Sequence, residues 1–279
     1  MYLHEEKSIL TPGGQLRPEF HKLATLFGVD TTGTIRETAE RFQRRFVTPR
    51  TDRWNEPAVT LSTVKRWYAF RLLRKLGLLD TVTPPSSVHR IDEILILGGI
   101  FSGCEQKFEA ANALGEHSRI GSVAHLGSDR KLETDELDSL QKLGIDTSDC
   151  RTESDMMRLL SQHTTWSVGF QGTIHHDVSA SATVGHRAHT GDTLEEYLRV
   201  RQPTEGATLV VVMLNPHVGF QSAQVARYLQ IHRPDLQIHV VAPLARQGSQ
   251  DLSLLMGAVA RWLIRWTEAA EHLGTPVFV

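Results

Sequence analysis

The sequence predicts an α/β fold in which a doubly wound, Rossmann-like and mostly parallel sheet follows an N-terminal α-helical section. From residue 91 onward, short and continuous apolar runs alternate with amphipathic stretches. Before that point, apolar residues recur only at helical spacing. Continuous apolar runs are typical of strands covered on both faces, and alternation of strands with helices favours a parallel sheet with right-handed crossovers.

The helical section covers residues 1–90 and holds three predicted helices. Apolar spacing predicts the first within LRPEFHKLATLFGV and the second over IRETAERFQRRF, with Thr32 or Thr34 as the N-cap of the second. The third spans TVKRWYAFRLLRKL, with Ser62 as its N-cap and Gly77 just past its end. The Pro- and Ser-rich segment TVTPPSSVHR then ends the section as a linker.

The third predicted helix is rich in Lys and Arg and also carries Trp67 and Tyr68. Such a mixture of side chains can contact nucleic acid. Because the net charge of the chain is −2, we interpret this segment instead as an amphipathic packing helix with a solvated basic face.

The Rossmann-like domain, residues 91–279, contains all the predicted strands. We expect strands over EILILGG, RIGSVAHLG, TLVVVML and QIHVVAP. We expect helices over FSGCEQKFEAANALGEH, LETDELDSLQKLG, TESDMMRLLSQH, SAQVARYLQIHRP and SLLMGAVARWLIRWTEAAEHL, the last of which would pack on the sheet. A His-, Gly- and Ser-rich segment at 164–206 breaks the alternation, and we interpret it as an insertion with a candidate strand at WSVGF and a candidate helix at TLEEYLRV.

Charge and cysteine content exclude several classes of protein. Lys and Arg number 30 and Asp and Glu number 32, so the bulk charge gives no reason to expect nucleic acid or an anionic membrane as a partner. The two cysteines, Cys104 and Cys150, cannot form a multi-disulfide framework. No signal-peptide pattern and no apolar run long enough to span a membrane is present. We therefore expect a cytoplasmic protein whose partner is a small-molecule ligand.

The residues that follow the predicted strands form the candidate site, because the ligand crevice of an open parallel sheet lies beyond the carboxyl ends of its strands. In the turn GGIFSG, glycine lets backbone N–H groups approach a phosphate or carboxylate, and the next helix adds its positive amino-terminal end. The spacing is neither GxGxxG nor GxxxxGK[ST], so a tight strand exit needed only for packing is the alternative. The candidate ligand-binding residues are Gly98, Gly99, Ser102, Gly127, Ser128, Arg130 and Asn215.

His217, Glu153 and Glu133 are the candidate catalytic residues. His217 follows the TLVVVML strand, where it is placed for acid–base chemistry or is a surface residue of an Asn-Pro turn. Glu153 is a carboxylate at the end of the sheet or part of a helix cap. Glu133 opens a predicted helix, where acidic residues also interact favourably with the helix dipole.

Histidines between residues 175 and 192 suggest a metal site as a further alternative. His175, His176, His186 and His189 fall in one segment with Asp177 and Asp192. An HxxH pair can supply two ligands to a first-row metal, but no zincin motif accompanies it. We therefore expect a polar loop or substrate lid there and assign no metal ligands. The sequence leaves the cofactor unknown.

The order of these turns resembles the YdcF/SanA/ElyC-like family of Rossmann-like proteins over about 91–245. ILILGG matches the opening strand and Gly-rich turn of that family, and VAHLGSDRKLETDEL resembles its second strand and turn, with Glu133 or Glu136 as the helical glutamate. CRTESDMMRLL stands at the third motif with Glu153, and LVVVMLNPHVGFQSAQVARYL resembles the fourth with His217. The Asn-Thr-x-Glu-Asn core and the arginine of the fourth motif are absent.

The resemblance implies a site at the carboxyl ends of the strands and ligands similar to nucleotides or S-adenosylmethionine. We therefore expect a protein that binds a small anionic or nucleotide-like ligand and, if it is an enzyme, acts on it as a transferase or hydrolase. One alternative is a non-catalytic sensor or interaction protein with a degenerate site. The other is a metal-dependent hydrolase that uses the histidines of 175–192.

Overall fold

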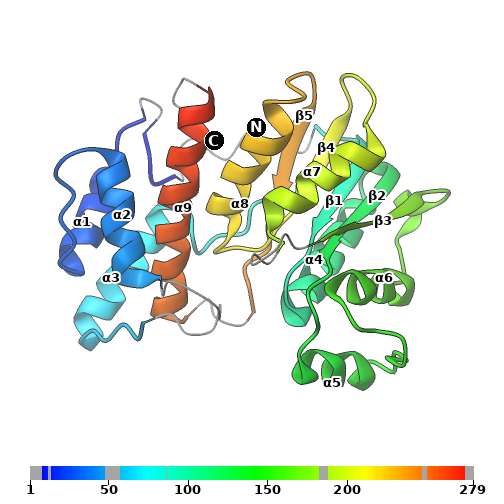
Figure 1. The fold of residues 1–279 in the computed structure, drawn as a ribbon, viewed down its shortest axis with the longest axis horizontal. Helices are drawn as coiled ribbons and strands as arrows, with labels where there is room; N and C mark the ends of the chain where they lie inside the picture. The colour runs from blue at the N-terminus through cyan, green and yellow to red at the C-terminus, as the bar shows by residue number, and fades with distance from the viewer. Residues whose placement is uncertain are drawn as a thin grey trace. The chain divides into compact units, whose positions relative to one another are not determined.

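The chain forms two compact units in the computed structural model, which describes residues 8–11, 14–47, 57–85, 87–181, 188–246 and 250–273 (Figure 1). We call them the sheet unit and the helical unit. The sheet unit comprises Val82–Leu214 and Tyr228–Pro243. The helical unit comprises the described parts of Tyr2–Thr81, Asn215–Arg227 and Leu244–Val279.

The sheet unit is built on five parallel strands in the order β3-β2-β1-β4-β5. The strands are β1 (Arg90–Leu97), β2 (Arg119–Ser128), β3 (Ile174–Ala180), β4 (Thr208–Val212) and β5 (Gln237–Val241). The helices between them are α4 (Phe101–Leu114), α5 (Thr134–Lys142), α6 (Glu153–His163) and α7 (Thr190–Arg201). From β1 the chain adds β2 and β3 on one side, then returns to add β4 and β5 on the other. This order confirms the predicted doubly wound α/β fold, and its switch point lies between β1 and β4.

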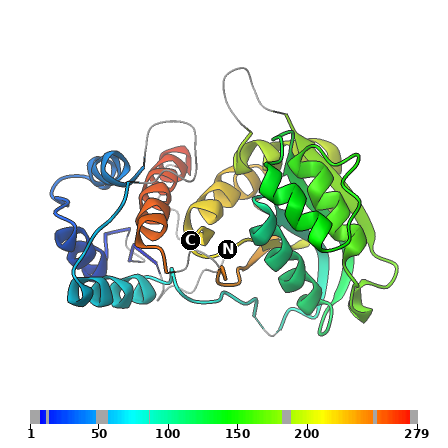
Figure 2. The same cartoon turned by 90° about the horizontal axis from the view of Figure 1, so that it is seen from below.

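Helices cover both faces of the sheet because side chains of a strand point alternately to its two faces. Ile94 and Ile96 of β1 pack with Phe108 of α4 and with methionines of α6. α4 and α6 lie side by side over this face (Figure 1, Figure 2). On the other face, the buried Glu93 of β1 accepts a hydrogen bond from Tyr197 of α7 at 2.5 Å. The predicted continuous apolar strands are thus buried on both sides.

The segment 164–206 contributes an edge strand and a helix to the sheet unit. The helix predicted at TLEEYLRV is confirmed as α7, but the strand predicted at WSVGF is wrong, because Val168–Phe170 is a short 3₁₀ helix. The strand is β3, which begins at Ile174 and, among the described strands, pairs with β2 alone. Strands at the edge of a sheet keep solvent-exposed positions, so β3 carries polar residues where a loop was expected.

The helical unit contains the three predicted N-terminal helices and two later ones. They are α1 (Pro18–Leu26), α2 (Ile35–Phe46), α3 (Thr63–Lys75), α8 (Val218–Val225) and α9 (Leu252–Leu273). Thr34 caps α2 by accepting a hydrogen bond from the Glu37 N–H at 3.2 Å. Ser62 stands at the N-cap position of α3 without a side-chain hydrogen bond, and Gly77 follows that helix with a φ of 82°.

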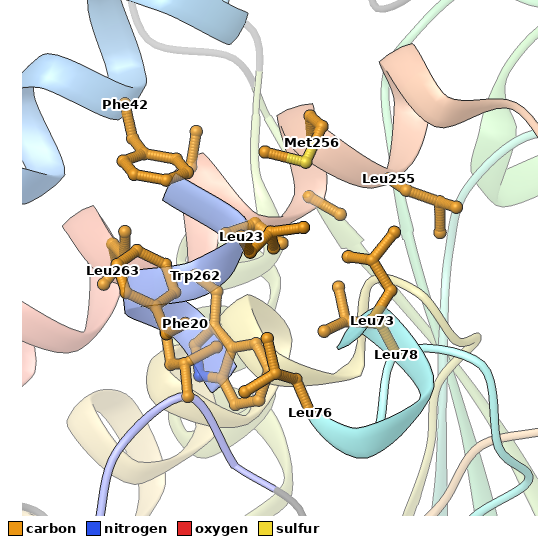
Figure 3. Close-up of a cluster of buried hydrophobic side chains, with 14 of the residues drawn as sticks. Phe20, Leu23, Phe42, Leu73, Leu76, Leu78, Leu255, Met256, Trp262 and Leu263 are labelled. Carbon is orange, nitrogen blue, oxygen red and sulfur yellow. The ribbon is translucent and has the colours of Figure 1, made fainter. Parts of the chain in front are cut away.

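The core of the helical unit is formed by α9 together with the N-terminal helices. Met256, Trp262 and Leu263 of α9 lie among side chains of α1, α2 and α3, including Phe20 and Phe42 (Figure 3). The prediction that this helix packs on the sheet is wrong, because its apolar face contacts α2 and α8. None of the helices in the described residues combines the length and apolar composition needed to cross a bilayer.

A matched pair of isoleucines tests the burial in the sheet. Ile94 is 0% exposed in the central strand β1, whereas Ile174 is 61% exposed in the edge strand β3. We expect Ile94→Ala to lower the free energy of unfolding by about 2 to 5 kcal/mol, because it removes buried methyl groups and leaves a cavity. Ile174→Ala should change it by less than about 0.5 kcal/mol. Urea unfolding followed by circular dichroism measures both, and equal losses would contradict this assignment of core and edge.

Candidate functional site

A buried lysine forms hydrogen bonds with the backbone of the turn between β1 and α4. Lys107 of α4 is 3% exposed. Its Nζ donates hydrogen bonds to the carbonyl oxygens of Leu97 and Gly98, both at 2.6 Å. Since a buried ammonium group is costly without acceptors, these two bonds fix the carbonyl groups in the direction of Lys107.

Arg130, two residues past the end of β2, holds the next carbonyl group of the same turn. Its Nη2 donates to the carbonyl oxygen of Gly99 at 2.8 Å. The guanidinium also forms a bidentate pair with Glu136 of α5, with Nη1 to Oε2 at 2.5 Å and Nη2 to Oε1 at 2.8 Å. Both side chains of this pair are less than a tenth exposed. Arg130 therefore ties the turn after β1 to the first turn of α5.

Glu136 also reaches the amino-terminal end of α4. Its Oε1 accepts a hydrogen bond from the N–H of Phe101, the first residue of α4, at 3.2 Å. Burial alone would raise the pKa of Glu136, but the hydrogen bond from Arg130 and backbone N–H groups outweigh it, so the pKa lies below its ordinary value of 4.5. The carboxylate is thus charged in the folded protein and satisfies one of the N–H groups that begin α4.

The carbonyl directions determine where the N–H groups of the turn point. In a trans peptide, the N–H of one residue points opposite to the C=O of the residue before it. The N–H groups of Gly99 and Ile100 are therefore directed away from Lys107 and Arg130. Within the part of the chain that the structure describes, these two N–H groups and that of Ser102 have no hydrogen-bond acceptor. The turn thus presents three unsatisfied donors at the amino-terminal end of α4.

Both glycines of this turn lie close to other atoms. A Cβ on Gly98 would lie 2.8 Å from Oε1 of Glu153. A Cβ on Gly99 would lie 3.2 Å from Nζ of Lys107. At Gly98 a Cβ would also lie 2.7 Å from the backbone carbonyl oxygen of Leu126, so packing excludes a side chain there, whereas the flexible end of Lys107 could move aside at Gly99. Ser102, the second residue of α4, is partly exposed beside it.

Ser128 and Glu153 form a second buried pair at the carboxyl end of β2. The Ser128 hydroxyl donates to Oε2 of Glu153, and both residues are less than a tenth exposed. Glu153 is the first residue of α6, and that helix is capped by Thr152, which accepts from the Asp155 N–H at 3.2 Å. The cap therefore does not require Glu153, whose carboxylate lies at the end of the sheet. Gly127 lies against the backbone of α6, where a side chain would collide.

Of the two glutamates that the sequence leaves open for α5, the buried one is Glu136. Glu133 is exposed and stands at the N-cap position of α5. Its backbone N–H donates to Oε2 of Glu136 at 3.0 Å. Glu133 thus lies at the surface of the loop, and Glu136 supplies the carboxylate that contacts the β1–α4 turn.

Asn215 and His217 belong to the helical unit. Asn215 precedes a cis peptide bond to Pro216 and is 0% exposed. Its Nδ2 donates to the carbonyl oxygens of Gly77 at 2.8 Å and Asp80 at 2.6 Å, so it fixes the segment that follows α3. His217 stands at the N-cap position of α8, with its ring edge-on to Phe220. The side chains described above around the β1–α4 turn all belong to the sheet unit, so Asn215 and His217 are not among them.

The described histidines of 175–192, which are His175, His176 and His189, lie in different surroundings. His175 lies on the face of β3 that also carries Asp177, and its Nδ1 is 3.4 Å from Nε2 of His125 in β2. Burial and the neighbouring His125 lower the pKa of His175. His176 points to the opposite face, and His189 caps α7 by accepting from the N–H of Gly191 at 3.1 Å.

The described histidines of this segment belong to no group of possible metal ligands. Among the described residues no three His, Cys, Asp or Glu side chains are grouped so that they could hold a metal ion. His186, the first histidine of the HxxH pair, lies outside the described residues. His125 instead pairs with Asp177 at 2.9 Å, and this hydrogen bond is the main cause that lowers the pKa of the Asp177 carboxyl.

Lys107 is the functional candidate that the sequence reasoning missed. It lies one position from Phe108 on the stripe of α4 that also holds Cys104 and Ala111, all of them buried. A lysine on the apolar stripe of a helix that follows a Gly-rich turn was the available signal.

A surface cavity of about 310 Å³, lined by Arg90, Arg119 and Gly121, lies at the opposite, amino-terminal ends of β1 and β2.

The buried Arg130–Glu136 pair has a testable pH dependence. We expect Glu136→Gln to lower the free energy of unfolding at neutral pH by about 3 kcal/mol, because Arg130 loses its buried countercharge. The folded-state pKa of Glu136 lies below its unfolded value, so its stabilisation is full above about pH 4.5 and is lost as the pH falls through the folded pKa. The two stability curves should therefore converge in acid.

Urea unfolding between pH 3 and pH 8 makes this comparison, with the exposed Glu195→Gln as the matched control. The control should follow the wild type at every pH. A constant gap between wild type and Glu136→Gln down to the lowest pH would contradict the charged pair.

No protein-family model matches the chain, and no curated protein matches it.

Proposed function

We propose that the sheet unit binds a small molecule through a phosphate or carboxylate group at the β1–α4 turn. The observation that carries the proposal is the set of three backbone N–H groups, of Gly99, Ile100 and Ser102, that lack an acceptor in the described chain. An anion is the natural acceptor for such donors, because the α4 dipole adds positive potential at the same point.

The position of the turn in the sheet supports the same proposal. β1 lies beside β4 at the switch point of the strand order, and ligands of doubly wound folds bind beyond the carboxyl ends of the strands at such points. Nucleotides fit this position because their phosphates take several N–H donors at once. The carboxylate of an S-adenosylmethionine-like ligand would meet the same donors.

The charged groups behind the turn favour recognition by backbone dipoles over attraction by net charge. Lys107 and Arg130 contribute two positive charges, and Glu136 and Glu153 contribute two negative charges when ionised. With no net charge in the cluster, we expect binding that changes little between low and physiological salt. The catalytic roles expected for Glu153, Glu133 and His217 stay predictions, as does a non-catalytic sensor with the same fold.

Substitution of Ile100 tests the turn directly. Ile100 has a φ of −78°, which proline adopts, and its N–H donates no hydrogen bond within the described chain. Ile100→Pro therefore removes one donor without breaking an internal bond, whereas Ile100→Val keeps the donor. A hydrogen bond to a charged group contributes about 1.5 to 3 kcal/mol, so we expect Ile100→Pro to weaken binding by about tenfold to a hundredfold and Ile100→Val to leave it unchanged.

The probes are inorganic phosphate, AMP, ATP and S-adenosylmethionine, measured by thermal shift and by titration calorimetry. A ligand at a hundred times its dissociation constant should stabilise the folded protein by about 2.7 kcal/mol. Each variant is compared with its own unliganded melting temperature, so that a change in stability is not mistaken for a change in binding. Equal binding by the two Ile100 variants, or no binding of any probe, would contradict the proposal and favour the non-catalytic alternative.

A further inference from the structure

The side of α3 that faces away from the core carries cationic and apolar side chains together. Five of the thirteen residues of α3 are Lys or Arg, and none is Asp or Glu. Its buried residues, such as Leu72 and Leu73, pack into the core of the helical unit, where Leu73 is seen in Figure 3. At 3.6 residues per turn, the opposite side of the helix carries Val64, Trp67, Arg71 and Arg74. We call these four residues the outer face of α3.

Two large apolar side chains of the outer face are exposed to solvent one turn apart. Val64 is 76% exposed and Trp67 is 63% exposed. A single exposed apolar residue is ordinary on a protein surface, but an adjacent pair that includes a tryptophan is typical of a contact surface. Packing within the helical unit does not account for either side chain.

Among the described residues, the two arginines of the outer face have no carboxylate partner. Lys75, at the end of α3, pairs with Glu19 at 3.6 Å, and Arg66 donates to the carbonyl oxygen of Gln250 at 2.7 Å. Arg71 and Arg74 form no ion pair with any described residue. The guanidinium of Arg71 lies 5.7 Å from the ring centroid of Trp67, so positive charge and the aromatic ring are presented together.

We propose that the outer face of α3 docks on an anionic phospholipid surface. Tryptophan is enriched at membrane interfaces because its ring is apolar and its N–H is polar. Val64 would enter the boundary of the acyl chains beside Trp67, and the two arginines would meet the headgroup phosphates. Because the apolar contact is small, this binding is weak and reversible, and it is independent of the ligand proposed for the β1–α4 turn.

The side chains favour a lipid surface over nucleic acid. Trp67 and the arginines would suit either partner, but an exposed valine has no counterpart along a phosphate backbone and does have one at the acyl boundary. The net charge of −2 for the whole chain also opposes a long polyanion. A lipid surface is contacted by one face only, so local charge on α3 decides the interaction.

Flotation of the full chain with vesicles measures this binding. Vesicles of phosphatidylglycerol with phosphatidylcholine supply the anionic surface, and vesicles of phosphatidylcholine alone supply the neutral one. We expect binding to the anionic vesicles that exceeds binding to the neutral ones and that decreases as salt is added. Arg71→Glu with Arg74→Glu should reduce the partition coefficient at least about tenfold, and Trp67→Ala should reduce it severalfold.

The matched control is Lys131→Glu with Lys142→Glu, two exposed lysines of the sheet unit, which changes the net charge equally. Circular dichroism of all variants establishes that they are folded.

A second measurement uses brominated lipid, which quenches tryptophan close to the acyl chains. It should reduce the tryptophan emission of the wild type and leave the emission of Trp67→Phe unchanged. Equal binding to both kinds of vesicle, an equal loss in the control, or binding of an oligonucleotide without binding of vesicles would overturn the proposal.

Discussion

Two buried cations set the backbone conformation at the carboxyl end of β1, and the rest of the candidate site depends on them. A buried charge is costly unless its donors find acceptors. Lys107 and Arg130 find them in three consecutive carbonyl groups, those of Leu97, Gly98 and Gly99. The bonds that satisfy these cations also turn the following N–H groups away from them. The stability of this turn and the direction of its N–H groups therefore have one physical cause.

Elements of the fold could be predicted where the pattern of apolar residues shows which faces of the element are buried. β1 and β4 are buried on both faces, so their apolar runs predicted them directly. β3 was not predicted, because an edge strand keeps exposed positions and its residues resemble those of a polar loop. The pattern of α9 showed that one side of the helix is apolar. It carried no information on which surface that side contacts, and the helix packs on α2 and α8.

The rule that ligands bind beyond the strand ends led to the turn and to Ser128, Arg130 and Glu153, but not to Lys107. The turn holding Gly98 and Gly99 was identified because glycine after a buried strand signals a close approach. The contact with Lys107 was harder to derive, because Lys107 is ten residues from Leu97 in the chain and its place on the apolar stripe of α4 was the signal of its burial. Glu133 and Glu136 are three positions apart at the start of α5, and the sequence does not show that Glu136 is the buried one that pairs with Arg130.

The composition of the helical-unit core constrains the order in which the chain can fold. Phe20, Leu23 and Phe42 are buried partly by Met256 and Leu263, more than two hundred residues later in the chain. During synthesis the N-terminal helices therefore emerge long before the helix that completes their core. Until α9 leaves the ribosome, these aromatic side chains lack part of their native contacts, and transiently exposed apolar surface of this kind favours aggregation.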